Sequence, residues 1–343
     1  MVRLRSFAWL TLATLLLASC GEDITPTQPE SGGDGQASAA ALAVASNTWT
    51  ARAPMPLPHS NFALGAAPNA AGQWVAYTFG GSDPADDETG FYTDTYNVAT
   101  DTWGSGGGFS LIDAAYLNGV GKIGNRFYFT GGESCCDEDF KFFNDTWAYQ
   151  PGTQQLFHRA ALPKASRDGV TGVIAGKLYV LPGYCSGEAV DPGHCDVGGP
   201  IRQLYRYDPS ANTWTTRRQA PHFHASGAAA VINDKFYVVG NSNQGPALDV
   251  YDPATDTWQT RAPIPTPGYR LFGAALQSKL FVISSSYPSG QPVTLKASLY
   301  DPATNTWTAR AAPPLVGPIV RVTLNGQPRL LLVGPAATYL YTP

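Results

Sequence analysis

One eight-residue motif recurs along most of this chain. It reads YDPATNTW over residues 300–307, and close copies read YDPATDTW over 251–258, YDPSANTW over 207–214 and YNVATDTW over 96–103. A further copy over 149–156, YQPGTQQL, has lost the tryptophan. Self-similarity of this kind is the signature of a repeat architecture, in which each copy forms the same small structural unit.

Each copy of the motif predicts a hairpin between two strands. Its proline fixes the φ angle of the turn, and its Asp and Asn side chains bond to their own backbone. Aromatic and β-branched runs such as 177–181 and 235–239 precede the motif, and short runs of small residues such as 227–232 precede those. Such runs indicate strands rather than helices. Each repeat is therefore expected to form four short antiparallel strands, one blade of a β-propeller.

The repeat resembles the kelch motif. Gly-Gly pairs at 80–81 and 131–132 end the second predicted strand, a tyrosine precedes the turn and a tryptophan follows it. The resemblance covers about residues 49–343 and implies a kelch-type propeller, although later repeats have other residues in place of Gly-Gly. The tryptophans, and the arginines three residues after them, occupy the same place in several repeats, which indicates a structural role.

The ends of the chain indicate how the repeats are arranged. Residues 341–343 match only the beginning of the motif, and residues 45–49 match its end. We therefore predict an all-β domain over 45–343, a six-bladed propeller in which the N-terminal strand pairs with the C-terminal blade and closes the ring, leaving no open sheet edge. The six counted second strands end near residues 79, 130, 181, 239, 283 and 333.

Residues 1–20 have the pattern of a targeting segment. Two arginines precede an apolar stretch over 7–17 that is too short to span a bilayer. Leu-Ala-Ser-Cys at 17–20 resembles a bacterial lipobox, which implies an exported lipoprotein anchored by acyl chains on Cys20. By the same resemblance, Gly21 favours the outer membrane or cell surface, facing the periplasm or the exterior. The alternative is an ordinary secretory signal with an incidental cysteine.

Composition limits the remaining possibilities. Residues 21–44 are rich in Gly, Ser, Ala and Pro and lack aromatic residues, so they are expected to form a flexible tether. The formal net charge is −4, and no basic stripe is present, which argues against a nucleic-acid partner. The cysteines lack Cys-x-x-Cys spacing, and the acidic run over 83–88 lacks EF-hand spacing. We expect a monomer with no metal and no cofactor.

Four cysteines follow Cys20 and are expected to form disulfides in an oxidising compartment. Cys185 and Cys195 are close in sequence and are the first candidate pair. Cys135 and Cys136 then form a vicinal disulfide or stay free. Alternatively, each of this adjacent pair bonds to one of the other two, because both sets occupy the same loop of consecutive repeats.

Long connections after the second strand of several repeats define one candidate face. Carboxylates beside exposed rings suit sugars or cationic ligands, and the alternative is that these are solvated loops. Function is often carried on such loops. The acidic and aromatic loop residues that we single out are Asp86, Asp87, Glu88, Glu133, Asp137, Phe140, Phe143, Tyr184 and Glu188.

A second set of polar residues leads into the inner strands, near the expected axis. Aligning the repeats places Ser166, His224 and Arg270 at equivalent positions. Such groups suit an anionic or polyhydroxyl ligand at the channel mouth, and His can transfer protons. The alternative is that they cap strands and line a water-filled channel, since none has the spacing of a catalytic motif. This set comprises His59, Asn61, Asp113, Arg167, Asp168, His222, His224, Tyr269 and Arg270.

Three function classes follow from these features. We favour a membrane-tethered binding module for a glycan, peptide or protein, and do not expect an enzyme. The second class is a carbohydrate-active isomerase, because the blade count and the export signal are similar to those of bacterial sialic acid mutarotase. That resemblance places the site at the channel mouth, with Glu133, Glu188, His224 and Arg270 as candidates. The third class is a scaffold in an envelope complex.

Overall fold

The computed structural model of this chain describes residues 46–82, 92–108, 114–134, 141–187, 194–195, 198–242, 245–265, 268–286 and 292–343. The chain divides into two units, Met1–Ala43 and Val44–Pro343, and every described residue lies in the second. The elements in these ranges are all strands. Accordingly, no helix among the described residues is long and apolar enough to cross a membrane.

Six sheets in the described part of the chain have four antiparallel strands each. The first three, in spatial order, are β2 (Ala63–Pro68), β3 (Trp74–Phe79), β4 (Tyr92–Asn97) and β5 (Thr102–Gly108); β6 (Val120–Ile123), β7 (Arg126–Thr130), β8 (Thr146–Gln150) and β9 (Gln155–Arg159); and β11 (Val170–Ile174), β12 (Lys177–Leu181), β15 (Tyr205–Asp208) and β16 (Thr213–Thr216).

The other three four-stranded sheets follow the same order. They are β17 (Ala228–Ile232), β18 (Lys235–Ser242), β19 (Gly245–Asp252) and β20 (Thr257–Arg261); β21 (Arg270–Leu276), β22 (Lys279–Ser286), β23 (Thr294–Asp301) and β24 (Thr306–Arg310); and β25 (Ile319–Leu324), β26 (Gln327–Val333), β27 (Thr338–Thr342) and β1 (Thr48–Arg52). A seventh, three-stranded sheet is made of short strands: β10 (Ser166–Arg167), β13 (Tyr184–Cys185) and β14 (Gly199–Pro200).

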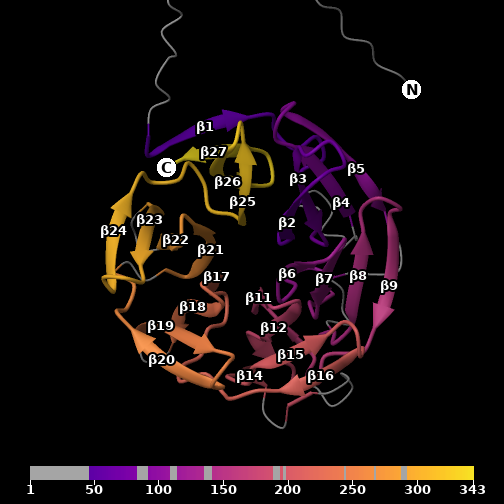
Figure 1. Ribbon diagram of the computed structural model, residues 1–343, viewed down its shortest axis with the longest axis vertical. Coiled ribbons are helices and arrows are strands. Elements are labelled where there is room, and N and C mark those ends of the chain that lie inside the picture. Colours follow the sequence, from indigo (N-terminus) through magenta and orange to yellow (C-terminus); the bar gives the residue numbers. More distant parts are fainter. Residues whose placement is uncertain are drawn as a thin grey trace, which may run out of the picture. The chain divides into compact units, whose positions relative to one another are not determined.

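These sheets form a β-propeller. Figure 1 shows the six four-stranded sheets arranged about a common centre, with the strand named first above in each sheet nearest to the centre and the strand named last outermost. In the sheet that holds both ends of the second unit, β1 pairs antiparallel with β27, from Thr48 opposite Thr342 to Arg52 opposite Thr338. The all-β prediction and the four antiparallel strands per repeat are confirmed.

The recurring motif forms the hairpin between the third and fourth strands. The residue before its final Thr-Trp lies in the left-handed region, which Asn and Asp tolerate because their short side chains bond locally. The decayed copy keeps this backbone with a glutamine. These residues are Asn47, Asp101, Gln154, Asn212, Asp256 and Asn305, with φ angles from 53° to 57°.

The tyrosine and tryptophan of the motif fasten each hairpin to its surroundings. The tyrosine hydroxyl donates to an Asx side chain of the motif at 2.5–2.9 Å. Within one turn the pairs are Tyr96 to Asp101, Tyr207 to Asn212, Tyr251 to Asp256 and Tyr300 to Asn305, and across the two ends of the domain Tyr341 donates to Asn47. The tryptophan Nε1 donates to a backbone carbonyl of the preceding sheet's outer connection: Trp49 to Ala311, Trp103 to Ala53, Trp214 to Ala160, Trp258 to Arg218 and Trp307 to Ala262, at 2.8–3.0 Å. The predicted structural role of the tryptophans is confirmed.

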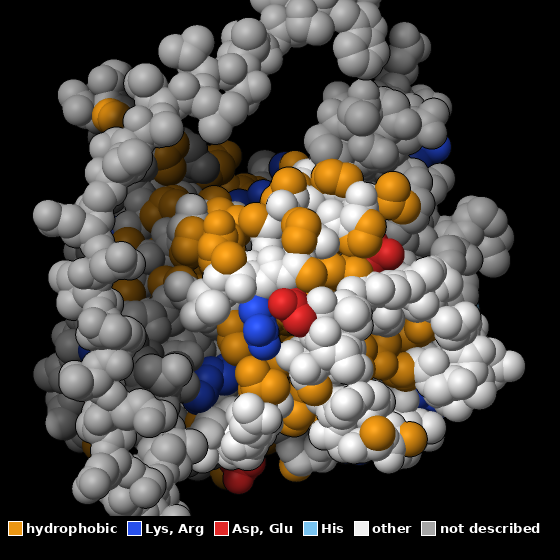
Figure 2. Space-filling model, turned by 90° about the horizontal axis from the view of Figure 1, so that it is seen from above, with side chains coloured by type: hydrophobic (Ala, Val, Ile, Leu, Met, Phe, Trp, Pro, Cys, Tyr) orange, Lys and Arg blue, Asp and Glu red, His pale blue; other side chains and the backbone are white. Residues whose placement is uncertain are grey.

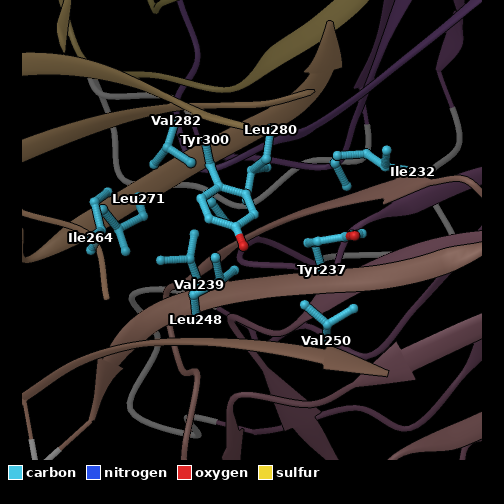
Figure 3. Close-up of a cluster of buried hydrophobic side chains, with 12 residues drawn as sticks. Ile232, Tyr237, Val239, Leu248, Val250, Ile264, Leu271, Leu280, Val282 and Tyr300 are labelled. Carbon is cyan, nitrogen blue, oxygen red and sulfur yellow. The ribbon is translucent and has the colours of Figure 1, made fainter. Parts of the chain in front are cut away.

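The core lies between neighbouring sheets. Figure 3 shows Tyr300 within a cluster that joins the β17–β20 and β21–β24 sheets. Tyr300 is 0% exposed and packs with Leu280 and Val282 of its own sheet and with Val239 and Leu248 of the preceding one. Burying aromatic and aliphatic area in this way is the main source of stability in such a fold.

Figure 2 shows one side of the molecule, on which Lys or Arg and Asp or Glu side chains are scattered among hydrophobic and uncharged ones. Ion pairs between strand and turn recur elsewhere: Lys177 lies 2.6 Å from Asp208, and Lys279 lies 2.8 Å from Asp301. Exposed pairs of this kind add little stability.

Cys185 and Cys195 form a disulfide, with their Cα atoms 6.1 Å apart. This confirms the first pair predicted from the sequence. Cys20, Cys135 and Cys136 lie outside the described residues.

Candidate functional site

A chain of backbone hydrogen bonds runs between the segments that lead into consecutive inner strands. The amide of Tyr116 donates to the carbonyl of Asn61, that of Asp168 to Tyr116, that of Ser226 to Asp168 and that of Leu271 to Ser226, at 2.9–3.1 Å. The first four of these five residues have φ angles of 53–60°. Non-glycine residues rarely adopt this conformation, so its repetition indicates that the surrounding structure fixes it.

A cavity of about 120 Å³ lies against this backbone chain. Apolar side chains such as Phe62, Leu117 and Phe272 form part of its lining. Its polar side chains come from five separate repeats: Asn61, Tyr116, Asp168, Ser226 and Arg270. Convergent polar groups in an otherwise apolar recess are typical of a binding site.

Arg270 is the cation of this cavity. Its Nη1 donates to Asn61 Oδ1 at 3.0 Å, and its Nη2 lies 3.6 Å from Asp168 Oδ1. The guanidinium carbon lies 5.1 Å from the ring centre of Tyr116 and 5.8 Å from that of Phe272. These contacts use only some of the five N–H donors of an arginine. Arg270 is therefore held in place and still has donors for a ligand.

A second arginine, Arg167, lies on the other side of Asp168. Its Nη1 donates to Asp168 Oδ2 at 2.7 Å, and its Nε is 2.6 Å from Glu133 Oε2. Its guanidinium is enclosed by three rings: Tyr116 at 5.5 Å, Phe142 at 5.5 Å and Tyr184 at 5.4 Å. Cations so placed against aromatic faces are stabilised electrostatically.

The two carboxyl groups of this network have altered acidity. Burial raises the pKa of Glu133 to about 7, against the opposing effect of the Arg167 guanidinium. Burial also raises the pKa of Asp168, while Arg270 and Arg167 oppose that rise. A carboxylic acid that titrates near neutral pH can give or take a proton under ordinary conditions. Glu133 thus has the acidity of a proton-transfer group, although it stands behind Arg167 and does not line the cavity.

A separate cluster joins two histidines to one buried carboxylate. Asp249, 0% exposed in β19, accepts from His222 Nδ1 and His224 Nε2, both at 2.9 Å, and from Thr260 Oγ1 at 2.7 Å. Burial acts to raise the pKa of Asp249, but these bonds outweigh it and hold the pKa below its usual value. Burial lowers the pKa of His224. This cluster joins the segment before β17 to β19. It thus gives His222 and His224 a structural role, the alternative considered for them from the sequence.

The structure brings together residues from both predicted sets. Asn61, Asp168 and Arg270 line the cavity, and Arg167, Glu133 and Tyr184 form the adjoining network. The predicted residues that lie outside the described part of the chain are Asp86, Asp87, Glu88, Asp113, Asp137, Phe140 and Glu188.

Other predicted residues lie apart from this cavity. His59 is buried beside Asp94, with Nδ1 3.5 Å from Asp94 Oδ2. Tyr269 is 77% exposed and is not among the cavity's lining residues. Phe143 packs against the hydrophobic core rather than on an open loop face. Of the predicted loop face, the structure describes Glu133, Phe143 and Tyr184, so the face as a whole stays a prediction.

The alignment of Arg270 with Ser166 and His224 was wrong by two residues. Strand pairing places Val170 opposite Leu181, Ala228 opposite Val239 and Phe272 opposite Ile283, and two residues before these stand Asp168, Ser226 and Arg270. Ser166 and His224 are instead fully buried. A simple count gives the correct register in four repeats, because the cavity residues 61, 168, 226 and 270 each stand nine positions after the recurring arginines 52, 159, 217 and 261; the count does not hold after Arg310.

Sequence reasoning missed Tyr116, Phe142 and Ser226. Ser226 is found by the nine-residue count. Tyr116 follows a repeat that lacks the arginine, so the count does not reach it. Phe142 contacts Arg167 from another repeat, and no local pattern marks that contact.

The described residues contain no group of three or more His, Cys, Asp or Glu side chains placed to hold a metal ion. No family model matches the chain. Over 140 residues, 40% of this chain, the sequence is 28% identical to N-acetylneuraminate epimerase of Haemophilus influenzae strain PittEE and to that of strain 86-028NP. The matched segment spans 31% of the length of these relatives.

The fold is similar to a solved structure described as "Structure of YjhT". The TM-score is 0.65 at 17% sequence identity, over 84% of this chain and 96% of the other. At that identity the likeness concerns the fold, and it agrees with the propeller formed by the sheets.

Proposed function

We propose that this propeller binds a sialic-acid-like sugar, an anionic sugar with a carboxylate, in the cavity beside Arg270. The observation that carries the proposal is the position of Arg270, which Asn61 and Asp168 hold at the cavity with donors to spare. A guanidinium recognises a carboxylate by paired hydrogen bonds. The name of the curated relatives, N-acetylneuraminate epimerase, supports this ligand class.

The rest of the cavity suits the other parts of such a sugar. Sugar hydroxyls need both donors and acceptors, which the hydroxyls of Ser226 and Tyr116 supply. The C–H faces of the sugar can pack against the Tyr116 ring. The Asp168 carboxylate does not cancel the positive charge of the site, since this single carboxylate is shared between Arg167 and Arg270.

A second candidate function is interconversion of the two anomers of the bound sugar. Opening and closing the sugar ring requires proton removal from the anomeric hydroxyl and proton delivery to the ring oxygen. Asp168 favours this candidate, because it lines the cavity and burial raises its pKa. Binding alone requires no such group.

Ligand-induced stabilisation tests the proposal. The melting temperature of the protein is measured with N-acetylneuraminic acid and with N-acetylmannosamine, which lacks the carboxylate. A ligand at about 100 times its dissociation constant stabilises the native state by about 2.7 kcal/mol. We expect a rise with the sugar acid alone, its loss in Arg270→Ala, and its retention in the control Arg329→Ala. Equal rises in both variants, or none with the wild type, would overturn the proposal. Anomeric exchange followed by NMR then separates turnover from binding.

We propose in addition that the propeller has six kelch-type blades and that β1 completes the last one. Two observations support this arrangement. β1 extends the sheet of β25, β26 and β27. The inner strands β2, β6, β11, β17, β21 and β25 each contact the next, and β25 also contacts β2.

The export and anchoring of the chain are also proposals. We propose that it is a monomeric lipoprotein held on Cys20 by acyl chains, with residues 21–44 as a tether. The Cys185–Cys195 disulfide supports an oxidising compartment. Metabolic labelling with a clickable fatty acid tests this: the label should appear on the wild type and vanish in Cys20→Ala. Should no sugar bind, capture of envelope proteins by the anchored chain tests the scaffold alternative.

A further inference from the structure

A second cavity, of about 200 Å³, is also lined by Arg270. The two cavities share Asn61, Phe62, Arg270, Phe272 and Pro318 in their walls. A ligand whose carboxylate meets Arg270 is therefore next to both. The first cavity has the smaller volume, about 120 Å³, and takes only part of a sugar acid.

The two cavities differ in chemistry because the repeats differ at one position. In each of these repeats, one residue of the first strand pairs with a residue at or near the end of the second strand, namely Phe79, Leu181, Val239 or Ile283. Asn61, Asp168, Ser226 and Arg270 each stand two residues before that first-strand residue. In the last repeat that residue is Pro318, whose carbonyl accepts the Val333 amide at 3.1 Å. The corresponding residue is thus Val316, the one apolar side chain among those five.

Val316 and its neighbours give the second cavity an apolar wall. Besides the shared residues, Val316, Val333 and Pro335 line it, together with Ser60 and the backbone of two glycines. Phe62 and Phe272 present their rings from two different repeats. The same cavity is lined by Arg270, whose side chain is aliphatic along its stem and cationic at its end, so an amphipathic group fits there.

We propose that this second cavity is a subsite for the N-acyl group of the sugar acid whose carboxylate Arg270 binds. This inference rests on the function proposed above and adds the substituent that the site selects. An apolar cavity of about 150 Å³ can hold benzene, so one of about 200 Å³ has room for an acyl chain longer than acetyl. The site then favours N-acylated sugar acids and tolerates longer acyl groups.

The affinity should follow the length of the acyl chain. Each methylene that moves from water into an apolar wall tightens binding about fourfold. Isothermal titration calorimetry of the wild-type protein is carried out with N-acetyl-, N-propanoyl- and N-butanoylneuraminic acid, and with the analogue that has a hydroxyl in place of the amide. We expect dissociation constants that fall about fourfold per added methylene, and the weakest binding for the hydroxyl analogue.

Val316→Asn tests the wall itself. It should abolish the gain from longer acyl chains and leave the affinity for the hydroxyl analogue within about twofold, because that analogue places nothing in the cavity. Val293→Asn is the matched control, since Val293 is a 48% exposed valine that does not line the cavity. Thermal melts of both variants without ligand show that they fold.

The outcomes separate this inference from the function on which it rests. Equal affinity for all four sugar acids, lost in Arg270→Ala, would overturn the acyl subsite and leave the proposed function standing. An undiminished chain-length gain in Val316→Asn would also overturn it. If none of the sugar acids binds the wild type, the proposed function and the subsite are both wrong.

Discussion

The hydroxyl of Tyr300 donates to Oδ1 of Asn305 at 2.7 Å, five residues further along the same hairpin. The same oxygen accepts the backbone N–H of Ala262 at 3.0 Å, from the connection that leaves the preceding sheet. Tyr300 is completely buried, so its hydroxyl depends on this partner. One side-chain oxygen thus closes a turn and joins two sheets.

We expect Asn305→Ala to destabilise the protein by about 2 kcal/mol, because it leaves one buried hydroxyl and one amide without an acceptor. Urea denaturation followed by tryptophan fluorescence measures the change. Gln154→Ala is the matched control, since Gln154 has nearly the same φ angle, 53° against 55°, in the copy that lacks the tyrosine–Asx bond. Equal losses in the two variants would show that the backbone conformation, not the shared acceptor, sets the effect.

Glu133 should make stability depend on pH around neutrality. Burial raises the pKa of Glu133 to about 7 from an ordinary value of 4.5. The native state therefore holds this proton more firmly than the unfolded chain does, and the stability that this provides below pH 4.5 is lost as the pH rises through 7. Glutamine cannot ionise, so Glu133→Gln should gain about 3 kcal/mol relative to wild type between pH 4.5 and pH 8.

Chemical denaturation of both proteins across that pH range measures the difference. Asp208→Asn is the control, because the hydrogen bond from Lys177 lowers the pKa of Asp208 and places its titration below the range. A constant difference between Glu133→Gln and wild type from pH 4.5 to 8 would contradict an elevated pKa at this carboxyl.

Asp249 should be among the least replaceable polar residues. It is fully buried and accepts from His222, His224 and Thr260. Asp249→Asn removes the charge and presents N–H donors to two histidines, which we expect to cost about 3–5 kcal/mol at pH 7. Thr260→Val removes one bond alone and should cost about 1.5–3 kcal/mol. Equilibrium unfolding measures the free energy of unfolding of both variants. A loss in Asp249→Asn no larger than that in Thr260→Val would show that the bonds from the two histidines do not stabilise the protein.

The same cluster predicts acid sensitivity. Burial lowers the pKa of His224, so the native state resists its protonation and loses stability as the pH falls below the unfolded value of about 6.5. His224→Gln should lose less stability between pH 7 and pH 5 than wild type does. Thermal melts at the two pH values measure this, and a parallel decline in both proteins would contradict the prediction.

The fold could be predicted from the sequence because each repeated residue obeys a local rule. Asn305 and Asp256 adopt the left-handed conformation that short amide and carboxylate side chains tolerate. Tyr300 and Trp307 are aromatic residues in runs whose composition favours strands. Because these rules act within one repeat, several copies sufficed to establish the strands and the hairpins.

The site was only partly predictable because it is assembled across repeats. Arg167 meets Glu133 and Tyr184 through loops whose paths no periodic pattern sets. Asn61 and Arg270 are 209 residues apart in sequence, and the arrangement of the sheets about a common centre brings them together. The register of Arg270 follows from a spacing in the chain, since Arg270 stands nine residues after Arg261 as Ser226 does after Arg217.

The inner strands leave no room for larger side chains at certain glycines. A Cβ at Gly172 would lie 2.7 Å and 2.8 Å from two ring carbons of Phe236, and 2.8 Å from Val231 Cγ2. Phe236 is fully buried in the core of the next sheet. The same position holds Ala230 and Ala274 in the following two sheets, opposite Tyr237 and Phe281. Close approach of neighbouring inner strands thus depends on small residues.

We expect Gly172→Ala to cost about 1–3 kcal/mol, because overpacking forces a ring or a strand to shift. Gly152→Ala is the control: it lies in a turn with nothing within 4 Å of the added Cβ, so it reports only the effect on the unfolded chain. Urea midpoints with unchanged m-values measure both. Combining Gly172→Ala with Phe236→Leu should cost less than the sum of the single changes, since the smaller side chain removes the clashing ring edge. Strict additivity, or equal stability of the two glycine variants, would show that the inner strands can accommodate a larger side chain at residue 172 without a clash.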